Sequence, residues 1–600
     1  MARDWETHEH DVIVVGAGGA GLRAAIEAAA QGVSVGLICK SLLGKAHTVM
    51  AEGGIAAALG NVWPEDSWRV HFRDTMRGGK MLNNWRMAQL HAQEAPDRVL
   101  ELERWGALFD RTKDGRILQR DFGGHRYARL AHVGDRTGLE MIRTLQDHAV
   151  HQGIDVHMET TVLRLLKDGD RVCGAFAYRR DRGDFVVFRA KAVVLATGGI
   201  GKAWAITSNS WEYTGDGHSL ALWAGADLID MEFVQFHPTG MVWPPSVRGI
   251  LVTEGVRGDG GTLKNNQGER FMFRYVPEYF RAETADTEAE ADRWYADKTN
   301  NRRTPDLLPR DEVARAINAE VKAGRGTPHG GVFLDICTRR PADYIKKRLP
   351  SMYHQFKELA DVDITKDPME VGPTCHYVMG GVRVDADSAA STVPGLFAAG
   401  EVAGGLHGSN RLGGNSLSDL LVFGRRAGFH AALYAKDRGG QVKVEPSQVE
   451  SLAREALEPL SRRAGGENPY AIQHELQETM QRLVGIIRTE SELREAVGAI
   501  ERLKERAGRV RVDGGSAYNP GWHTALDLRS LLAVAECSTL AALERRESRG
   551  GHTREDYPKA DPEWGKVNVV LRRKDGGVTL AREPLPDLPA ELQKLLGESS

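Results

Sequence analysis

The feature that most constrains the fold of this chain is a glycine turn close to its N-terminus. Residues 11–15 (Asp-Val-Ile-Val-Val) predict a buried strand, residues 16–21 (Gly-Ala-Gly-Gly-Ala-Gly) a tight turn, and the alanine-rich residues 22–31 a helix. A second apolar strand is predicted at residues 33–38. Strand, glycine turn, helix and strand at this spacing are typical of a parallel α/β sheet that binds a nucleotide.

The turn matches the pattern G-x-G-x-x-G, and each glycine has a physical task. Gly16 makes the turn, Gly18 admits a pyrophosphate close to the backbone, and Gly21 lets the helix pack against the strand. The start of the helix offers free N–H groups and the positive end of its dipole to the phosphates. The second strand runs into Lys40 and Ser41 without an Asp or Glu for the ribose 2′-hydroxyl, which counts against NAD but not against FAD.

Two later strands also end on glycine. Residues 192–197 run into Gly198 and Gly199, and residues 395–399 run into Gly400 and Glu401. The carboxyl ends of strands are where an α/β sheet meets its ligand. We therefore expect one nucleotide-binding sheet, interrupted by an insertion.

The last third of the chain changes to charge-rich helical patterns. Residues 449–460, 474–488 and 490–506 place apolar side chains at helical spacing among charges that we expect to face water, and residues 566–571 form a β-like patch. The predicted fold class is α/β, with a Rossmann-like FAD-binding domain, an inserted α+β capping domain, a helical domain and a small C-terminal domain. The expected borders are 1–249 and 362–435 for the FAD-binding domain, 250–361 for the capping domain, 436–547 for the helical domain and 548–600 for the C-terminal segment.

Composition excludes several classes of protein. The 600 residues carry 79 Lys and Arg against 82 Asp and Glu, a net charge of −3, so there is no global basic field for nucleic acid. The five cysteines lack a CxxC pair, which indicates a reducing compartment. The same scattered spacing argues against zinc or an iron–sulfur cluster held by this chain alone, so we expect no metal site. We expect no signal peptide, and no apolar run approaches the roughly 20 residues that span a bilayer. The 67 glycines suggest a backbone that a ligand approaches closely.

A histidine follows the second strand within a stretch rich in glycine and alanine. Taken alone, a loop histidine is most often solvated or hydrogen-bonded. The run of residues 47–55, with His47-Thr48 and Ala-Glu-Gly53-Gly54-Ile, however, resembles the flavoprotein subunit of succinate dehydrogenase and quinol:fumarate reductase. The resemblance covers nearly the whole chain and continues in the same order through residues 214–217, 232–240, 253–258, 308–314, 373–381, 406–417 and 547–556.

The resemblance implies that FAD is covalently bound. In that family the histidine at the position of His47 carries FAD through the flavin 8α-methyl group. A bond to imidazole withdraws electron density and should raise the flavin potential, which succinate oxidation needs because a saturated dicarboxylate is a poor hydride donor. Besides the glycine turn, Lys40 and Ser41, the implied cofactor contacts are Thr48, Gly53, Gly54, Asp216, Glu401, Ser416 and Leu417.

The implied active site combines cations with a proton carrier. Removing a hydride from a C–C bond requires a clamped substrate, cations for its carboxylates and a group for the second proton. Arg310 resembles the family residue that exchanges this proton, with Glu254 and Arg257 as its relay. The residues that resemble the dicarboxylate ligands are His237, Thr253, His376 and Arg411, the last suited to a bidentate grip.

The resemblance also implies partners. Electrons must leave the reduced flavin, and no cysteine spacing in this chain can hold a cluster. We expect membrane-anchor subunits with quinone and an iron–sulfur subunit, which would place the chain peripherally on the cytoplasmic side of a bacterial inner membrane. The expected activity is oxidation of succinate to fumarate.

Three alternatives stay open. The first is a fumarate reductase that runs in the opposite direction. The second is a soluble relative such as an aspartate oxidase, which holds FAD without a bond and lacks a histidine at the position of His47. The third is a flavin-binding protein with a structural role or a role as a nucleic-acid-modification partner, against which the near-neutral charge and the complete dicarboxylate set argue.

Overall fold

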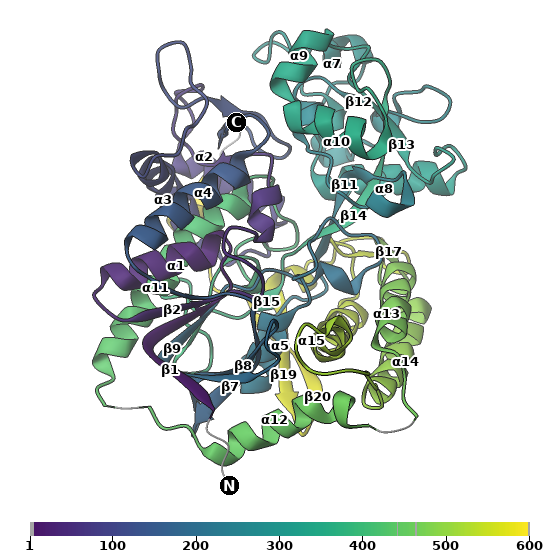
Figure 1. The fold of residues 1–600 in the computed structure, drawn as a ribbon. Helices are drawn as coiled ribbons and strands as arrows, with labels where there is room; N and C mark the ends of the chain where they lie inside the picture. The colour runs from purple at the N-terminus through teal and green to yellow at the C-terminus, as the bar shows by residue number, and fades with distance from the viewer. Residues whose placement is uncertain (1–4, 441, 463–464, 598–600) are drawn as a thin grey trace.

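The glycine turn belongs to a large mixed sheet. The computed structural model describes residues 5–440, 442–462 and 465–597. The sheet has seven strands in the order β6-β2-β1-β9-β8-β7, with β16 also paired to β9. These strands are β1 (Glu6–Val15), β2 (Val35–Ile38), β6 (Asp155–His157), β7 (Thr160–Asp168), β8 (Arg171–Arg179), β9 (Phe185–Leu195) and β16 (Leu396–Ala398). β6, β2, β1, β9 and β16 are parallel, whereas β7, β8 and β9 form an antiparallel meander. The predicted α/β class is confirmed, and the three distant strands that end near glycine, β1, β9 and β16, lie in one sheet, of which Figure 1 labels β1 and β9.

The strand β1 is covered on both faces. Val12 and Val14 join one hydrophobic core, and Ile13 and Val15 join another. Successive side chains of a strand point to opposite faces, so a continuous apolar run is needed where both faces are buried.

Two helices share the core on the Val12 side of the sheet. They are α1 (Gly19–Ala30), which begins three residues before the predicted start at Leu22, and α11 (Asn415–Asp437). A Cβ at Gly428 of α11 would lie 2.1 Å from the carbonyl oxygen of Ala24 in α1. Glycine at this position therefore allows the two helices to touch.

A second sheet with its helices forms the lobe at the upper right of Figure 1. Its antiparallel strands follow the order β11-β14-β13-β12. The elements are β11 (Val234–Met241), α7 (Glu288–Trp294), β12 (Thr262–Lys264), α8 (Arg310–Lys322), β13 (Val332–Asp335), α9 (Ala342–Arg348), α10 (Pro350–Ala360) and β14 (Met369–Val378). Val313 and Ile317 of α8 share a core with Leu334 of β13. β11 and β14 lie outside residues 250–361, and the borders of the capping domain stay a prediction.

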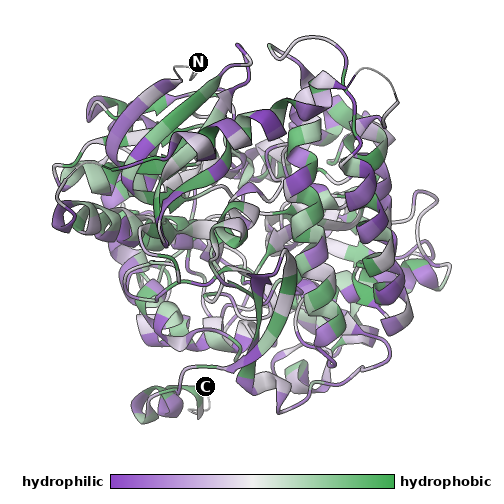
Figure 2. Cartoon of the chain, turned by 90° about the horizontal axis from the view of Figure 1, so that it is seen from below, coloured by the Kyte–Doolittle hydropathy of each residue, from purple (hydrophilic) through white to green (hydrophobic). Residues whose placement is uncertain are grey.

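The charge-rich segment is helical. It contains α12 (Pro446–Ser461), α13 (Pro469–Leu483), α14 (Glu490–Ala507) and α15 (Pro520–Glu544). A capping box starts α14, because Thr489 accepts from the backbone of Glu492 while the Glu492 carboxylate accepts from the backbone of Thr489. The buried residues of α14 have the predicted helical spacing and are Leu493, Ala496, Ile500 and Leu503. Hydrophilic and hydrophobic residues are interleaved along the helices on the right of Figure 2.

The helix predicted over residues 474–488 is too long. α13 ends at Leu483, and β17 (Ile487–Arg488) pairs with β18 (Thr553–Arg554). Arg488 is fully buried and donates to the carbonyl oxygens of Gly485 and Glu232. The conformation of residues 484–488 therefore depends on contacts with residues distant in sequence, which the local spacing of apolar residues cannot predict.

The C-terminal segment returns to the body of the molecule. β19 (Val567–Lys574), where a β-like patch is predicted, pairs with β20 (Gly577–Pro584) and with β10 (Leu228–Ile229). The final helix is α16 (Ala590–Gly597), whose Leu592 is buried. Across the described parts of the chain, no helix is both long and apolar enough to cross a membrane.

Candidate active site

The strand ends of the large sheet open onto a cavity. The cavity has about 1770 Å³ of empty space, its open mouth included. Its wall combines the glycine turn after β1, the segment around His47, and the second lobe at Thr253 and Arg310. A crevice at the carboxyl ends of parallel strands is the usual ligand site of such sheets.

The N-terminus of α1 faces this cavity. Gly18 and Gly19 line the wall, and α1 has neither a side-chain cap nor an acidic residue in its first turn. Gly16 has a φ of +108°, and a Cβ there would lie 2.2 Å from the carbonyl oxygen of Ala196. Gly21 is not on the wall, since a Cβ there would lie 1.8 Å from the carbonyl oxygen of Gly16. Gly21 instead allows α1 to pack closely against β1. The uncapped N–H groups at the start of α1 suit a phosphate.

His47 stands on the same wall. It begins the short 3₁₀ helix η1 (His47–Met50), and its ring meets Tyr213 edge-on with 4.7 Å between centroids. The backbone N–H of Ser210 donates to Nδ1 of His47 at 3.4 Å. Burial lowers the pKa of His47 to about 4, so the ring is neutral at neutral pH. A neutral imidazole on a cavity wall has a lone pair available as a nucleophile.

Two further histidines come from paired strands. His237 lies on β11, and His376 lies on β14 where a shift in register leaves it without a cross-strand partner. Such a bulge redirects a side chain, and here the two rings lie 5.2 Å apart. Nδ1 of His237 donates to the carbonyl oxygen of Thr239 at 2.9 Å, whereas its buried Nε2 has no hydrogen-bond partner within the described residues. Nδ1 of His376 contacts Oγ of Ser208 at 2.7 Å.

Two arginines share one acceptor beside these histidines. Arg310 is the first residue of α8, and Arg411 lies in the loop before α11. Oε1 of Gln235 accepts from Nη1 of Arg310 at 3.3 Å and from Nη2 of Arg411 at 3.0 Å. Arg411 also covers the ring of Tyr377 at 4.3 Å and donates to Oγ of Ser416 at 2.8 Å. Burial and the nearby Arg310 lower the pKa of Arg411 to about 9, which leaves it protonated at neutral pH.

Glu254 connects Arg310 to the interior. Its Oε2 accepts from Nε of Arg310 at 2.9 Å and lies 3.8 Å from Nη2 of Arg257, while its Oε1 accepts from the N–H of Gly123 at 2.5 Å. Burial would by itself raise the pKa of Glu254, but Arg310 and Arg257 outweigh burial and lower it to about 2. Arg257 is fully buried behind Glu254 and off the cavity wall. The three side chains form a line of contacts from the cavity into the protein.

The charge at this end of the cavity suits a dianion. Burial, reinforced by the arginines, lowers the pKa of His237 and of His376 well below the ordinary value, so both rings are neutral at neutral pH. Three arginines and the Glu254 carboxylate leave two net positive charges. The cations expected from the sequence are therefore the arginines, with the histidines as neutral polar groups until an anion binds.

The structure brings nearly all the expected site residues together. Only Gly21 and Arg257 are not on the cavity wall. Lys40 lines the wall but is engaged, because its Nζ donates to Asp216 and to Asp527 of α15 at 2.8 Å each. Burial raises the pKa of Glu401 to about 8, and its carboxyl accepts from the N–H of Val378 at 3.0 Å.

Some contributing residues escape the sequence reasoning. Gln235 joins the two arginines, Ser208 orients His376, and Tyr377 lies under Arg411. A signal exists for Gln235, because it stands two residues before His237 within the family-like run 232–240, and the strand β11 places both side chains on the same face.

Comparison with known proteins agrees with this geometry. A family model described as "FAD binding domain" matches residues 11–417, and one described as "Fumarate reductase flavoprotein C-term" matches residues 473–594. The chain belongs to the succinate dehydrogenase and fumarate reductase flavoprotein family. It is an FAD-dependent oxidoreductase, as the sequence resemblance predicts.

Individual members of this flavoprotein family match along nearly their whole length. A chain of the fumarate reductase (CoM/CoB) from Methanothermobacter marburgensis is 44% identical over 95% of this chain and 98% of its own. The succinate dehydrogenase flavoprotein subunit of Rickettsia conorii is 37% identical over 96% of this chain and 95% of its own. The solved structure of Mycobacterium smegmatis Sdh1 in complex with UQ1 has 60% identity and a TM-score of 0.85, covering 97% of this chain and 95% of that chain.

The cavity fits the FAD that the flavoprotein family implies. The uncapped start of α1 faces it at one place, and α11, which also lacks a side-chain cap, presents Ser416 and Leu417 at another. Two positive helix ends suit a pyrophosphate and an electron-rich ring. Gly53 and Gly54 add wall without side-chain bulk.

Proposed function

We propose that this chain is the catalytic flavoprotein subunit of a succinate dehydrogenase, which oxidises succinate to fumarate. The observation that carries the proposal is the short path between His47 and the substrate end. Nδ2 of Asn209 lies 3.4 Å from Nε2 of His47 and donates to the carbonyl oxygen of His376 at 3.0 Å. A cofactor attached at His47 would therefore stand beside the group that accommodates a dianion.

The substrate carboxylates would be held by side chains that already lack partners. Nε2 of His237 and Nε of Arg411 are buried without a hydrogen-bond partner among the described residues, and both side chains line the cavity. Nε of Arg411 can donate at once, and Nε2 of His237 can donate when a bound dianion has favoured its protonation. Thr253, which also lines the cavity, adds a hydroxyl. Two carboxylates held in this way fix the C–C bond in one orientation.

Proton handling would fall to Arg310. When bound, FAD supplies the hydride acceptor, and the neighbouring substrate carbon loses a proton as the double bond forms. Arg310 is on the wall and can take this proton only after passing its own to Oε2 of Glu254, an ionised carboxylate whose low pKa makes it a weak acceptor that would hold the proton only transiently. Nη2 of Arg257 lies 3.8 Å from Oε2 of Glu254, so its positive charge would favour the ionised form of Glu254 after the proton has left.

Covalent attachment of FAD through His47 belongs to the same proposal. The neutral ring and its position on the cavity wall support a role as nucleophile. Thr48 helps to hold the segment, since its hydroxyl accepts from the N–H of Gly19 at 3.2 Å. Attachment would also raise the flavin potential toward the value that succinate oxidation requires.

The proposal extends to the electron acceptors. All five cysteines are free, and four of them are buried. We therefore assign the iron–sulfur centres to a partner subunit, joined to a membrane anchor with quinone, on the cytoplasmic face of a bacterial inner membrane. Support comes from relatives named as succinate dehydrogenase and fumarate reductase subunits and from the complex of one with UQ1.

Turnover assays test the proposal against its competitors. The purified chain is assayed with succinate and an oxidising dye, with fumarate and a reduced dye, and with L-aspartate and oxygen. We expect turnover with succinate and fumarate and none with aspartate. Fumarate reduction that greatly exceeds succinate oxidation would favour the reverse direction, which the 44% identity to a fumarate reductase chain supports. Aspartate oxidation, or no dicarboxylate turnover in either direction, would overturn the proposal.

A further inference from the structure

Three histidines and an aspartate gather on the large sheet outside the cavity. His8 and His10 lie on β1, and Asp155 and His157 lie on β6. None of these four residues, called here the β1–β6 cluster, lines the cavity, and the proposed reaction uses none of them. The ring of His157 lies 4.5 Å from that of His8 and 5.7 Å from that of His10, centroid to centroid.

The polar atoms lie close enough together to share one ion after small side-chain movements. The ligand atoms of His8, Asp155 and His157 all lie within 4.8 Å of one another. Oδ2 of Asp155 is 3.2 Å from Nε2 of His157 and 3.5 Å from Nε2 of His10. Two ligands of a tetrahedral zinc with bonds of about 2.0–2.1 Å are roughly 3.3 Å apart. The two measured separations lie on either side of that value.

Two of the nitrogens are otherwise unused. The side chain of His10 is only 9% exposed, and its Nε2, which faces Asp155, is buried without a hydrogen-bond partner. Nε2 of His157 is likewise buried and without a hydrogen-bond partner, although the Asp155 carboxylate lies beside it. Burying such groups unsatisfied costs free energy, and a cation bound to Nε2 of His157 would remove that part of the cost.

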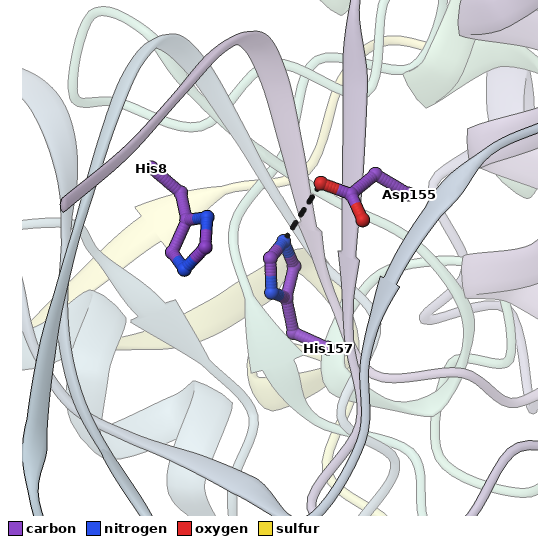
Figure 3. A group of neighbouring side chains, drawn as sticks. All are labelled: His8, Asp155 and His157. Carbon is purple, nitrogen blue, oxygen red and sulfur yellow. Dashed lines mark ion pairs between the residues drawn. The ribbon is translucent and has the colours of Figure 1, made fainter. Parts of the chain in front are cut away.

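The third histidine is oriented by a carboxylate. Nε2 of His8 donates to Oε1 of Glu6 at 3.0 Å, which leaves Nδ1 as the nitrogen with a free lone pair. Figure 3 shows one ring nitrogen of His8 turned toward His157 and Asp155. A histidine that donates one N–H to a carboxylate and offers the other nitrogen is the usual arrangement around a protein-bound metal.

We propose that the β1–β6 cluster binds a Zn²⁺ ion through His8, Asp155 and His157, with His10 packed beside them. Imidazole and carboxylate ligands suit zinc, and three protein ligands leave the fourth tetrahedral position to water. The ion would tie the first half of β1 to β6, an edge strand of the sheet. The expectation of no metal rests on the cysteines alone and does not consider these residues, which come from two segments distant in sequence.

Metal binding to the full-length, tag-free holoenzyme tests the proposal. After dialysis against a chelator, Zn²⁺ alone is titrated by calorimetry, and bound metal is measured by elemental analysis. Co²⁺ in place of Zn²⁺ reports coordination through its visible absorption. The variants are Asp155→Asn, at an exposed position, and His157→Gln, with His151→Gln at the exposed end of α4 (Thr137–His151) as the matched control.

We expect one zinc per chain, tetrahedral Co²⁺ bands, and a thermal midpoint that rises with Zn²⁺ in the wild type and in His151→Gln. Asp155→Asn and His157→Gln should weaken binding by at least about tenfold and lose the rise in midpoint. Absence of zinc from the wild type, or equal affinity in the wild type and Asp155→Asn, would overturn the proposal. Flavin content and dicarboxylate turnover do not enter the readout, so the result is independent of the proposed activity.

Discussion

Replacing Gln235 with leucine tests the arrangement of the substrate end most severely. Oε1 of Gln235 accepts from Arg310 at 3.3 Å and from Arg411 at 3.0 Å. Its Nε2 donates to Oδ1 of Asn410 and to the carbonyl oxygen of Arg411 at 2.8 Å each. Gln235→Leu keeps a buried side chain of similar size but removes the acceptor that two buried cations share.

The magnitude follows from the two charged hydrogen bonds. Each contributes roughly 1.5–3 kcal/mol, and every 1.4 kcal/mol of lost transition-state stabilisation is about tenfold in rate. Loss of both hydrogen bonds, partly offset by movement of the two arginines to other partners, should lower kcat/KM for succinate by at least about 100-fold. Both arginines would move relative to the substrate, so fumarate reduction should fall as well.

Steady-state kinetics with a dye acceptor provide the assay, together with flavin content and the thermal midpoint. Gln481→Leu is the matched control, since Oε1 of Gln481 accepts from the N–H of Ile206 at 3.0 Å away from the cavity wall. The control should keep near-normal kcat/KM. A Gln235→Leu protein with full flavin content and kcat/KM within about threefold of the wild type would refute the role assigned to this residue.

Three further changes probe the cofactor link, the proton path and the ion pair behind it. Acid precipitation should leave flavin in the wild-type pellet but release it from His47→Ser, and equal release from both proteins would contradict attachment. Arg310→Ala should lower kcat by about 10³-fold or more while flavin stays bound, whereas near-normal turnover would remove Arg310 from the proton path. The pKa of Glu254, about 2 against an ordinary 4.5, means that its ion pairs stabilise the fold fully above about pH 4.5 and lose this effect as the pH falls toward 2. The difference in unfolding free energy between the wild type and Glu254→Gln should shrink across that window, and a constant difference would count against the assignment.

Local patterns predict those parts of the fold that local physics decides. The apolar run of β1 reflects burial on both faces, and the glycine turn follows from close approach of α1 to the strand. The end of α13 escapes prediction because Arg488 turns toward Glu232 and His552, far away in the sequence. No periodicity within a helix encodes such partners.

The candidate active site likewise combines features that the sequence predicts with features that only the folded chain determines. The family motifs bring the expected residues to one cavity, but the neutral state of His237 and His376 depends on burial and on neighbouring arginines that only the folded chain assembles. The bulge that frees His376 is likewise a property of strand register. The β1–β6 cluster joins segments from either end of the first 160 residues, and no spacing rule connects them.

The central claim is that FAD and a dicarboxylate meet in the cavity beside His47 and Arg411. Anaerobic addition of succinate to the purified flavin-loaded chain, followed by flavin absorbance, tests this claim most directly. We predict bleaching of the flavin band in the wild type, with at least about tenfold more succinate needed for Arg411→Gln. An absorbance that stays unchanged at saturating succinate, while dithionite still bleaches the same sample, would contradict it.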